Sequence, residues 1–218
     1  MNIWQHYYKQ HHVNRDPHVY GMCKVNEQHK LFYVLVPKNA STSIRTNIAE
    51  SGFRNGNYHD EELVKQGYTP IIVLREPVER WCSGFAEYIN RRMGGKWRPM
   101  LNDEQALRLI FQRPAQDEHT ESQSMYIHGL DLSNAHVLRF DVDLNKNLAS
   151  LLRSYSIENK IDDIGTKYTT SGGKLDCKQF LLEMLANDEV KMNRIKTFYK
   201  LDTELYDSVK YYIREDKD

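Results

Sequence analysis

Residues 31–48 read LFYVLVPKNASTSIRTNI, and this segment is the most informative about the fold. Its first six residues are apolar and rich in β-branched and aromatic types, which is typical of a strand buried on both faces. Pro37 ends that strand, because proline has no N–H to donate to a neighbouring strand. The small and hydroxyl side chains of residues 39–43 favour a helix start, and Ile44 and Ile48 then share one face of the helix. We therefore predict a buried strand, a tight turn and a helix.

A turn that leads into a helix N-terminus leaves backbone N–H groups without acceptors, and the helix dipole adds partial positive charge. Lys38 adds a full charge, and residues 41–43 add hydroxyl donors. The turn therefore predicts an anion site, although a capped helix beside a solvated lysine has the same pattern. The triphosphate-binding pattern Gly-x-x-x-x-Gly-Lys-Ser/Thr is absent, because no glycine lies between Gly21 and Gly52. Within the turn, a left-handed backbone costs least at Asn39.

A second junction between a strand and a helix follows. Residues 71–74 form a short apolar strand, and an Arg-Glu-Pro turn begins at Arg75. The next helix has an apolar face, formed by Val78, Trp81, Phe85 and Ile89. We expect Arg75 and Ser83 to face the end of the sheet beside the first turn, where an arginine can bind two phosphate oxygens. The alternative is a surface ion pair of Arg75 with Glu76 or Glu79.

The two segments resemble the sulfotransferases that use 3′-phosphoadenosine-5′-phosphosulfate (PAPS), in particular the membrane-associated carbohydrate type and its bacterial relatives. The resemblance rests on residues 37–43 (PKNASTS) and 75–85 (REPVERWCSGF). Less specific similarity at residues 117–124, 137–148 and 198–206 extends it to about residues 30–210. One departure is Glu76, which stands where the family usually has aspartate.

The resemblance implies a site with two halves. The first segment would hold the 5′-phosphosulfate, and the second would hold the 3′-phosphate through its Arg and Ser. The implied donor-binding residues are Pro37, Lys38, Asn39, Ala40, Ser41, Thr42, Ser43, Arg75 and Ser83, and Lys167 is a further candidate from a later loop. Lys38 would also neutralise the departing oxygen during transfer, and no metal is required. The acceptor would be a hydroxyl group, with a carbohydrate expected.

The general base for that acceptor is left open between three residues. His59 lies between the two junctions, and His119 lies in the mid-chain segment Asp-Glu-His. Histidine titrates near neutral pH, which suits proton transfer. Glu87 on the second helix is the third candidate. For each of them an ordinary surface or core role is the alternative.

Alternation of strands and helices predicts a parallel sheet that is covered by helices on both faces. Together with the resemblance, this indicates an α/β fold, a P-loop NTPase-like three-layer sandwich. We expect a single domain over residues 1–218, with residues 1–18 as a surface arm. Ligands of such sheets bind at the C-terminal ends of the strands, where both junctions lie.

Composition excludes several other classes of protein. Lys plus Arg equals Asp plus Glu, at 30 each, so the charge balance gives no sign of a nucleic-acid partner. Three scattered cysteines fit neither a disulfide framework nor a zinc site, and His6, His11 and His12 lack a second ligand cluster. No apolar run is long enough to span a membrane, and no signal peptide is recognisable. We expect a cytoplasmic protein, unless a membrane anchor has been trimmed; the oligomeric state stays open.

Two loops are candidates for covering the site. Residues 91–99 are basic, contain paired glycines and Trp97, and have the composition of a lid or an acceptor-binding edge, or of a solvated loop. Lys167, Tyr168 and Lys174 belong to a later loop region that could close over the donor.

Two other functions fit parts of the pattern. A nucleotide kinase of related fold would need a magnesium-binding carboxylate at the end of a strand, and Asp141 follows residues 137–140, although Arg139 interrupts that apolar run. The missing triphosphate loop argues against it. A catalytically inert module that binds a phosphorylated nucleotide is the remaining alternative.

Overall fold

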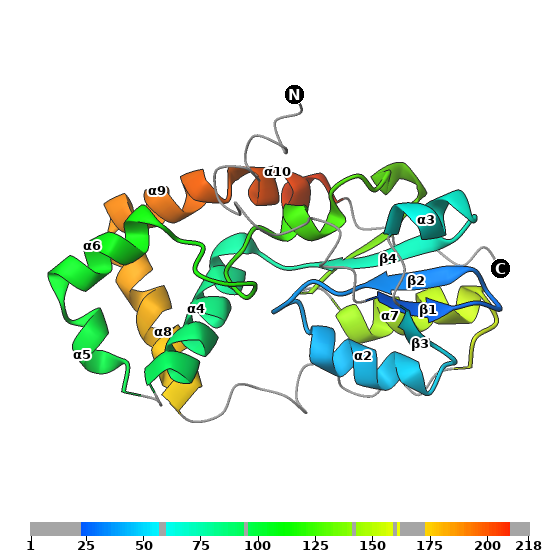
Figure 1. The fold of residues 1–218 in the computed structure, drawn as a ribbon, viewed down its shortest axis with the longest axis horizontal. Coiled ribbons are helices and arrows are strands. Elements are labelled where there is room, and N and C mark those ends of the chain that lie inside the picture. Colours follow the sequence, from blue (N-terminus) through cyan, green and yellow to red (C-terminus); the bar gives the residue numbers. More distant parts are fainter. Residues whose placement is uncertain are drawn as a thin grey trace.

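The computed structural model describes residues 23–56, 60–93, 96–140, 143–158, 161 and 173–209. A five-stranded sheet with the strand order β3-β1-β2-β4-β5 lies on one side of the molecule (Figure 1). The strands are β1 (Cys23–Asn26), β2 (Leu31–Val34), β3 (Arg54–Gly56), β4 (Thr69–Leu74) and β5 (His136–Arg139). β2, β4 and β5 are parallel, whereas β1 is antiparallel to both β2 and β3. The prediction of a parallel sheet is therefore correct for three of these strands, and the sheet as a whole is mixed.

β3 forms at a position where the local sequence favours a turn. The sequence Asn55-Gly56-Asn57 is typical of a turn, yet residues 54–56 pair with β1. The short connection between β1 and β2 places β1 at the edge of the parallel strands. A further extended segment can then add to its free side, whatever its turn propensity.

Some helices cover the sheet and others form a cluster beside it. They are α2 (Ser41–Ala49), α3 (Asp60–Lys65), α4 (Pro77–Met93), α5 (Arg98–Leu101), α6 (Glu104–Gln112), α7 (Leu144–Ser154), α8 (Gly173–Ala186), α9 (Glu189–Phe198) and α10 (Lys200–Ser208), with 3-10 helices η2 (Gln123–Ile127) and η3 (Leu132–Asn134). Pro77 opens α4, and the Asp103 carboxylate accepts from two backbone N–H groups of α6, as is typical of these residue types at helix starts.

Helices cover both faces of the sheet. Successive residues of a strand point to opposite faces, so each strand contributes side chains to both. On one face, Leu31 and Tyr33 of β2 pack with apolar residues of α2 and α7. On the other face, Phe32 and Val34 pack with residues of α3, η2 and α10. All four strand residues are nearly inaccessible to solvent. The prediction of a strand buried on both faces is therefore confirmed.

A separate helical cluster extends from the edge of this arrangement (Figure 1). The apolar face of α4, which includes Trp81 and Phe85, packs against residues of α5, α6, α8 and α9. Trp81 stacks on Phe85 at a ring-centroid distance of 5.2 Å, and its indole N–H donates to the carbonyl of Pro114. α4 therefore connects the two parts, since its first residues leave β4 and its later turns form the centre of the helical cluster.

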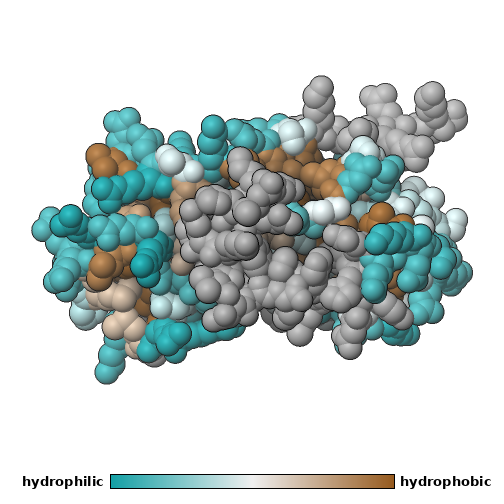
Figure 2. All heavy atoms as spheres, turned by 45° about the horizontal axis from the view of Figure 1, so that its top comes forward, coloured by the Kyte–Doolittle hydropathy of each residue, from teal (hydrophilic) through white to brown (hydrophobic). Residues whose placement is uncertain are grey.

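The surface in Figure 2 is mostly hydrophilic over the described residues, with hydrophobic side chains in scattered groups. The large apolar side chains exposed in the described ranges are Val64, Met93, Leu109, Leu175, Val190 and Leu201. No helix in those ranges combines the length and the apolar composition that crossing a bilayer demands.

Candidate functional site

The turn between β2 and α2 has a demanding backbone. Lys38 and Ala40 both adopt the left-handed region, with φ of 69° and 58°. For a residue with a side chain, this backbone conformation costs about 1–2 kcal/mol in free energy, so contacts elsewhere must hold the turn. Asn39 was the residue predicted to tolerate this conformation most cheaply. It instead lies between the two strained residues, with its side chain fully buried.

Three side chains from later in the chain hold the turn. Arg75 Nη1 donates to the Lys38 carbonyl oxygen at 3.0 Å, and Arg80 Nε donates to the Pro37 carbonyl at 3.1 Å. Asn39 Nδ2 donates to Gln123 Oε1 at 2.9 Å. These contacts account for a left-handed turn that contains no glycine.

The start of α2 is open to an anion. Ala40 takes the N-cap position without a side-chain hydrogen bond, and the first turn contains no acidic residue. Within the described ranges, the backbone N–H groups of residues 40–43 donate to no acceptor. Ser43 is buried, whereas Ser41 is half-buried and Thr42 is exposed. Unpaired amides at the positive end of a helix dipole form an anion site.

Arg75 leaves the C-terminal end of β4, directly beside that turn. Besides its bond to Lys38, its Nη2 donates to Glu79 Oε2 at 2.9 Å, and its guanidinium lies 4.7 Å from the centre of the Phe140 ring. The contact with the first turn and the alternative pairing with Glu79 thus occur together. Glu76 accepts instead from the backbone N–H of Glu79 at the start of α4.

A network of charges surrounds Lys38. Glu87 Oε2 lies 4.0 Å from Lys38 Nζ and 2.8 Å from Lys174 Nζ, and Glu87 Oε1 accepts from Arg91 at 3.0 Å. Lys178 Nζ lies 2.8 Å from the same Glu79 oxygen that Arg75 contacts. The network holds five cationic side chains, Lys38, Arg75, Arg91, Lys174 and Lys178, and three carboxylates, Glu79, Glu87 and Glu118. Positive charge is therefore in excess.

Burial and charge shift two pKa values in this network. Desolvation lowers the pKa of Lys38 below its ordinary value, and the Glu87 carboxylate partly opposes this effect. Burial alone would raise the pKa of Glu87, but hydrogen bonds from Lys174 and Arg91 and the charge of Lys38 bring it down to about 2. A carboxylate with so low a pKa is a weak proton acceptor, so Glu87 is a poor general base.

His119 has the geometry of an oriented imidazole. Its Nδ1 lies 3.1 Å from Asp117 Oδ2, and its backbone N–H donates to Asp117 Oδ1 at 2.9 Å. Its side chain is largely buried, at 13% exposed. A carboxylate on one ring nitrogen fixes the tautomer and leaves Nε2 available for proton transfer. In the described part of the chain, Asp117, Glu118 and His119 each offer one atom that could bind a metal ion, and these three atoms lie within 4.8 Å of one another.

α4 brings His119 close to the second junction. A Cβ atom on Gly84 would lie 2.0 Å from the His119 carbonyl oxygen, so only glycine permits this approach. Ser83, the residue before it, is buried on the same helix. The ion pairs Lys38–Glu87, Glu87–Arg91 and Arg91–Glu118 then connect the first turn to the segment that contains His119.

Some predicted site residues cannot be placed in this arrangement. His59, Lys167, Tyr168 and Asp141 lie outside the described residues. Lys174 does lie beside the site, through its contact with Glu87. Trp97 corrects the prediction of an aromatic acceptor edge, because it is 4% exposed and packs on Phe180 within the helical cluster.

Sequence reasoning did not assign site roles to Arg80, Gln123 and Asp202. Arg80 is 1% exposed and Gln123 and Asp202 are fully buried, although their side chains are polar or charged. The signal for Arg80 was its position inside the 75–85 segment. Gln123 was noted only as part of the mid-chain similarity, and nothing near Asp202 in sequence indicates burial.

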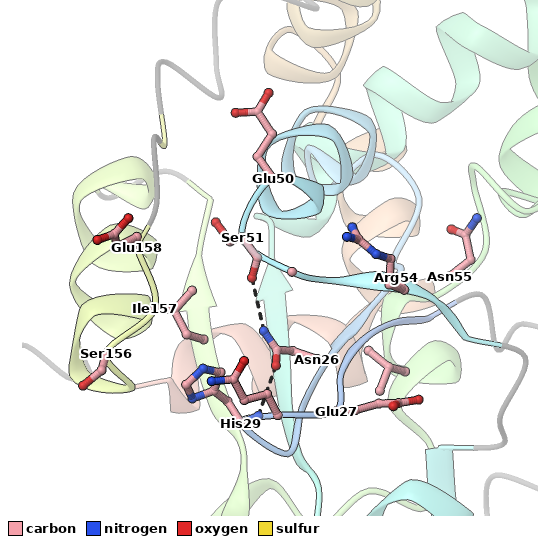
Figure 3. Close-up of a pocket in the computed structure, with 13 residues that line it drawn as sticks. Asn26, Glu27, His29, Glu50, Ser51, Arg54, Asn55, Ser156, Ile157 and Glu158 are labelled. Carbon is pink, nitrogen blue, oxygen red and sulfur yellow. Dashed lines mark hydrogen bonds between the residues drawn. The ribbon is translucent and has the colours of Figure 1, made fainter.

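A cavity of about 650 Å³ lies at the opposite end of β2 (Figure 3). It is lined by the β1–β2 turn, the ends of α2 and α7, and β3. Glu27, Glu50 and Glu158 contribute carboxylates to its lining, against a single arginine, Arg54. This charge balance does not suit a phosphate.

Comparison with protein-family models, with curated proteins and with solved structures gives no match for this chain.

Proposed function

We propose that this protein transfers a sulfuryl group from PAPS to a hydroxyl of an acceptor, with a carbohydrate as the expected acceptor. The observation that carries the proposal is the hydrogen bond from Arg75 to the Lys38 carbonyl. It joins the two anion-binding segments at the C-terminal ends of neighbouring parallel strands. PAPS carries phosphate groups at both ends of one ribose, so it needs two adjacent anion sites.

Each half of the site has its own role. The amides of residues 40–43 and the start of the α2 dipole bind the 5′-phosphate. Arg75 and Ser83 bind the 3′-phosphate, and so distinguish the donor from ordinary adenine nucleotides. The excess positive charge of the network, to which α8 contributes Lys174 and Lys178, supports binding of a ligand with several negative charges.

Lys38 and His119 have the roles in the transfer step. His119 Nε2 accepts the proton of the acceptor hydroxyl as the acceptor oxygen forms its bond to sulfur. The bond from sulfur to the bridging phosphate oxygen breaks, its electron pair stays on that oxygen, and adenosine 3′,5′-bisphosphate (PAP) leaves. The Lys38 ammonium stabilises the charge that develops on the leaving oxygen. Catalysis then depends on position and charge, as in phosphoryl transfer.

Ligand binding separates this function from the two alternatives. A ligand present at 100 times its dissociation constant stabilises the fold by about 2.7 kcal/mol, which a thermal-shift assay detects readily. PAP should raise the melting temperature, whereas ATP with Mg²⁺ should not. The reverse result would support a kinase. Stabilisation by PAP without sulfation of any member of a carbohydrate panel, followed with ³⁵S-labelled donor, would support an inert binding module.

A further inference from the structure

Gln123 connects the two halves of the site through its amide group. Its Oε1 accepts from Asn39 Nδ2 at 2.9 Å and from the backbone N–H of Arg75 at 3.2 Å. Its Nε2 donates to the Arg75 carbonyl at 2.8 Å. The Gln123 side chain is fully buried. One side chain therefore contacts both the strained first turn and the backbone from which the Arg75 guanidinium extends.

The Asn39 side chain completes this connection. Its Nδ2 also donates to the Val73 carbonyl at 2.7 Å, so both of its N–H groups are used. Val73 belongs to β4, the strand that leads into Arg75. Any shift of Gln123 would thus disturb the first turn and the second junction together.

α10 fixes the position of Gln123. The fully buried Asp202 carboxylate accepts from the backbone N–H groups of Gln123 and Ser124, at 2.8 Å and 3.0 Å, and from the Ser122 hydroxyl. A buried carboxylate needs such donors, because burial without them is costly. The three donors belong to consecutive residues, so Asp202 holds the backbone of this segment rather than a single side chain.

We propose that Gln123 is a positioning residue that couples the two phosphate-binding halves, and that Asp202 sets its place from α10. The inference rests on the proposed function, since it concerns how that site binds both ends of PAP. Gln123 does not contact the ligand in this proposal. It sets the distance and orientation between the amides of residues 40–43 and the Arg75 guanidinium.

This coupling demands an amide. Gln123 must accept hydrogen bonds at one atom and donate one at the other, and both Arg75 backbone groups are among its partners. Glutamate has the same shape and can still accept from Asn39 and from the Arg75 N–H. It cannot donate to the Arg75 carbonyl when ionised, so Gln123→Glu displaces the second half relative to the first.

The test compares three ligands by isothermal titration calorimetry on the full chain. PAP contacts both halves, 5′-AMP contacts the first half and 3′-AMP contacts the second. For Gln123→Glu, we expect the loss of PAP affinity to be about 10-fold or more, and to exceed the product of the losses for the two mononucleotides. Gln66→Glu, the same change at an exposed turn residue, should leave all three affinities unaltered.

Asp202→Asn provides a second variant, and circular dichroism checks that each variant is folded. This change keeps the shape of the side chain but replaces one acceptor oxygen with a donor, so it should give the same selective loss of PAP affinity. The coupling is wrong, while the proposed function stands, if the loss of PAP affinity only equals the product of the losses for 5′-AMP and 3′-AMP. The same conclusion follows if all three ligands bind each variant as they bind the wild type. If the wild-type protein does not bind PAP, the proposed function fails and the coupling fails with it.

Discussion

The Arg75 guanidinium donates a 3.0 Å hydrogen bond to the carbonyl oxygen of Lys38, across 37 positions of sequence. The two residues lie in the turns that follow the neighbouring parallel strands β2 and β4, so these turns meet at one edge of the sheet. This bond has two effects, because it helps to hold Lys38 in a left-handed backbone and directs the arginine toward the start of α2. The predicted halves of the site therefore lie side by side.

Lys38→Ala tests the charge on the first turn. We expect sulfuryl transfer to fall by about 10²-fold or more, the usual cost of losing one preorganised charge contact in a transition state. The measurement is the initial rate with ³⁵S-labelled donor. Lys65→Ala, at an exposed position on α3, is the control and should keep the wild-type rate. Equal rates for both variants would mean that Lys38 has no part in catalysis.

Arg75→Lys and Arg75→Ala test the second half. The arginine makes two charge-assisted contacts and presents a fork that lysine lacks. We expect PAP affinity to fall by roughly 10- to 100-fold in the alanine variant, since a hydrogen bond to a charged group contributes about 1.5–3 kcal/mol. Affinity for 5′-AMP should change much less, as measured by calorimetry. A parallel loss for both ligands would argue against a role in 3′-phosphate binding.

His119→Asn tests the general base. Loss of a positioned proton acceptor lowers turnover by roughly 10²- to 10⁴-fold. PAP binding should persist, because His119 is not assigned to either phosphate. Asp117→Asn should produce a smaller loss, since it weakens the contact that orients the imidazole but leaves the imidazole in place. Full turnover in His119→Asn would shift the assignment to another group, with His59 next to be tested.

Glu87→Gln tests the electrostatics of Lys38. The Glu87 carboxylate raises the pKa of Lys38 against the lowering effect of burial, so its removal should lower that pKa further. The alkaline limb of the kcat/KM profile should therefore move to lower pH than in the wild type. Glu62→Gln on α3 is the matched control. An unchanged alkaline limb would show that Lys38 does not control it.

The same variant has a consequence for acid stability. The pKa of Glu87 is lowered from 4.5 to about 2, so its stabilising effect is complete above about pH 4.5 and is lost as the pH falls toward 2. Melting temperatures should thus differ most between the wild type and Glu87→Gln at neutral pH. The difference should shrink as the pH is lowered through that range.

Gly84→Ala tests the contact between α4 and the His119 segment. The added Cβ would meet two backbone atoms of His119, at 2.0 Å and 2.7 Å, so one segment must move. We expect a loss of about 1–3 kcal/mol in the free energy of unfolding, measured by urea denaturation. Gly173→Ala, where a Cβ meets nothing within 4 Å, should not destabilise the protein. If the two variants were equally stable, the close approach at Gly84 would be wrong.

Local patterns predicted most of the secondary structure around the site. The apolar run before Pro37, the spacing of Ile44 and Ile48, and the apolar face from Val78 to Ile89 each occur as predicted, because short-range periodicity determines which face of an element is buried. The cap at Asp103 follows from the same kind of local rule. Local patterns did not predict the pairing of β3 with β1, because that pairing depends on which strand edge is free.

Local sequence patterns were sufficient to predict the two strand-to-helix junctions and to identify the polar residue types that they contain. The folded chain was needed to show that Arg80, Gln123 and Asp202 hold those junctions together, and that Trp97 belongs to the core. The physical reason is that hydrogen bonds between residues some 40 to 80 positions apart leave no local pattern. A buried polar side chain looks in sequence like an exposed one until its partners are known.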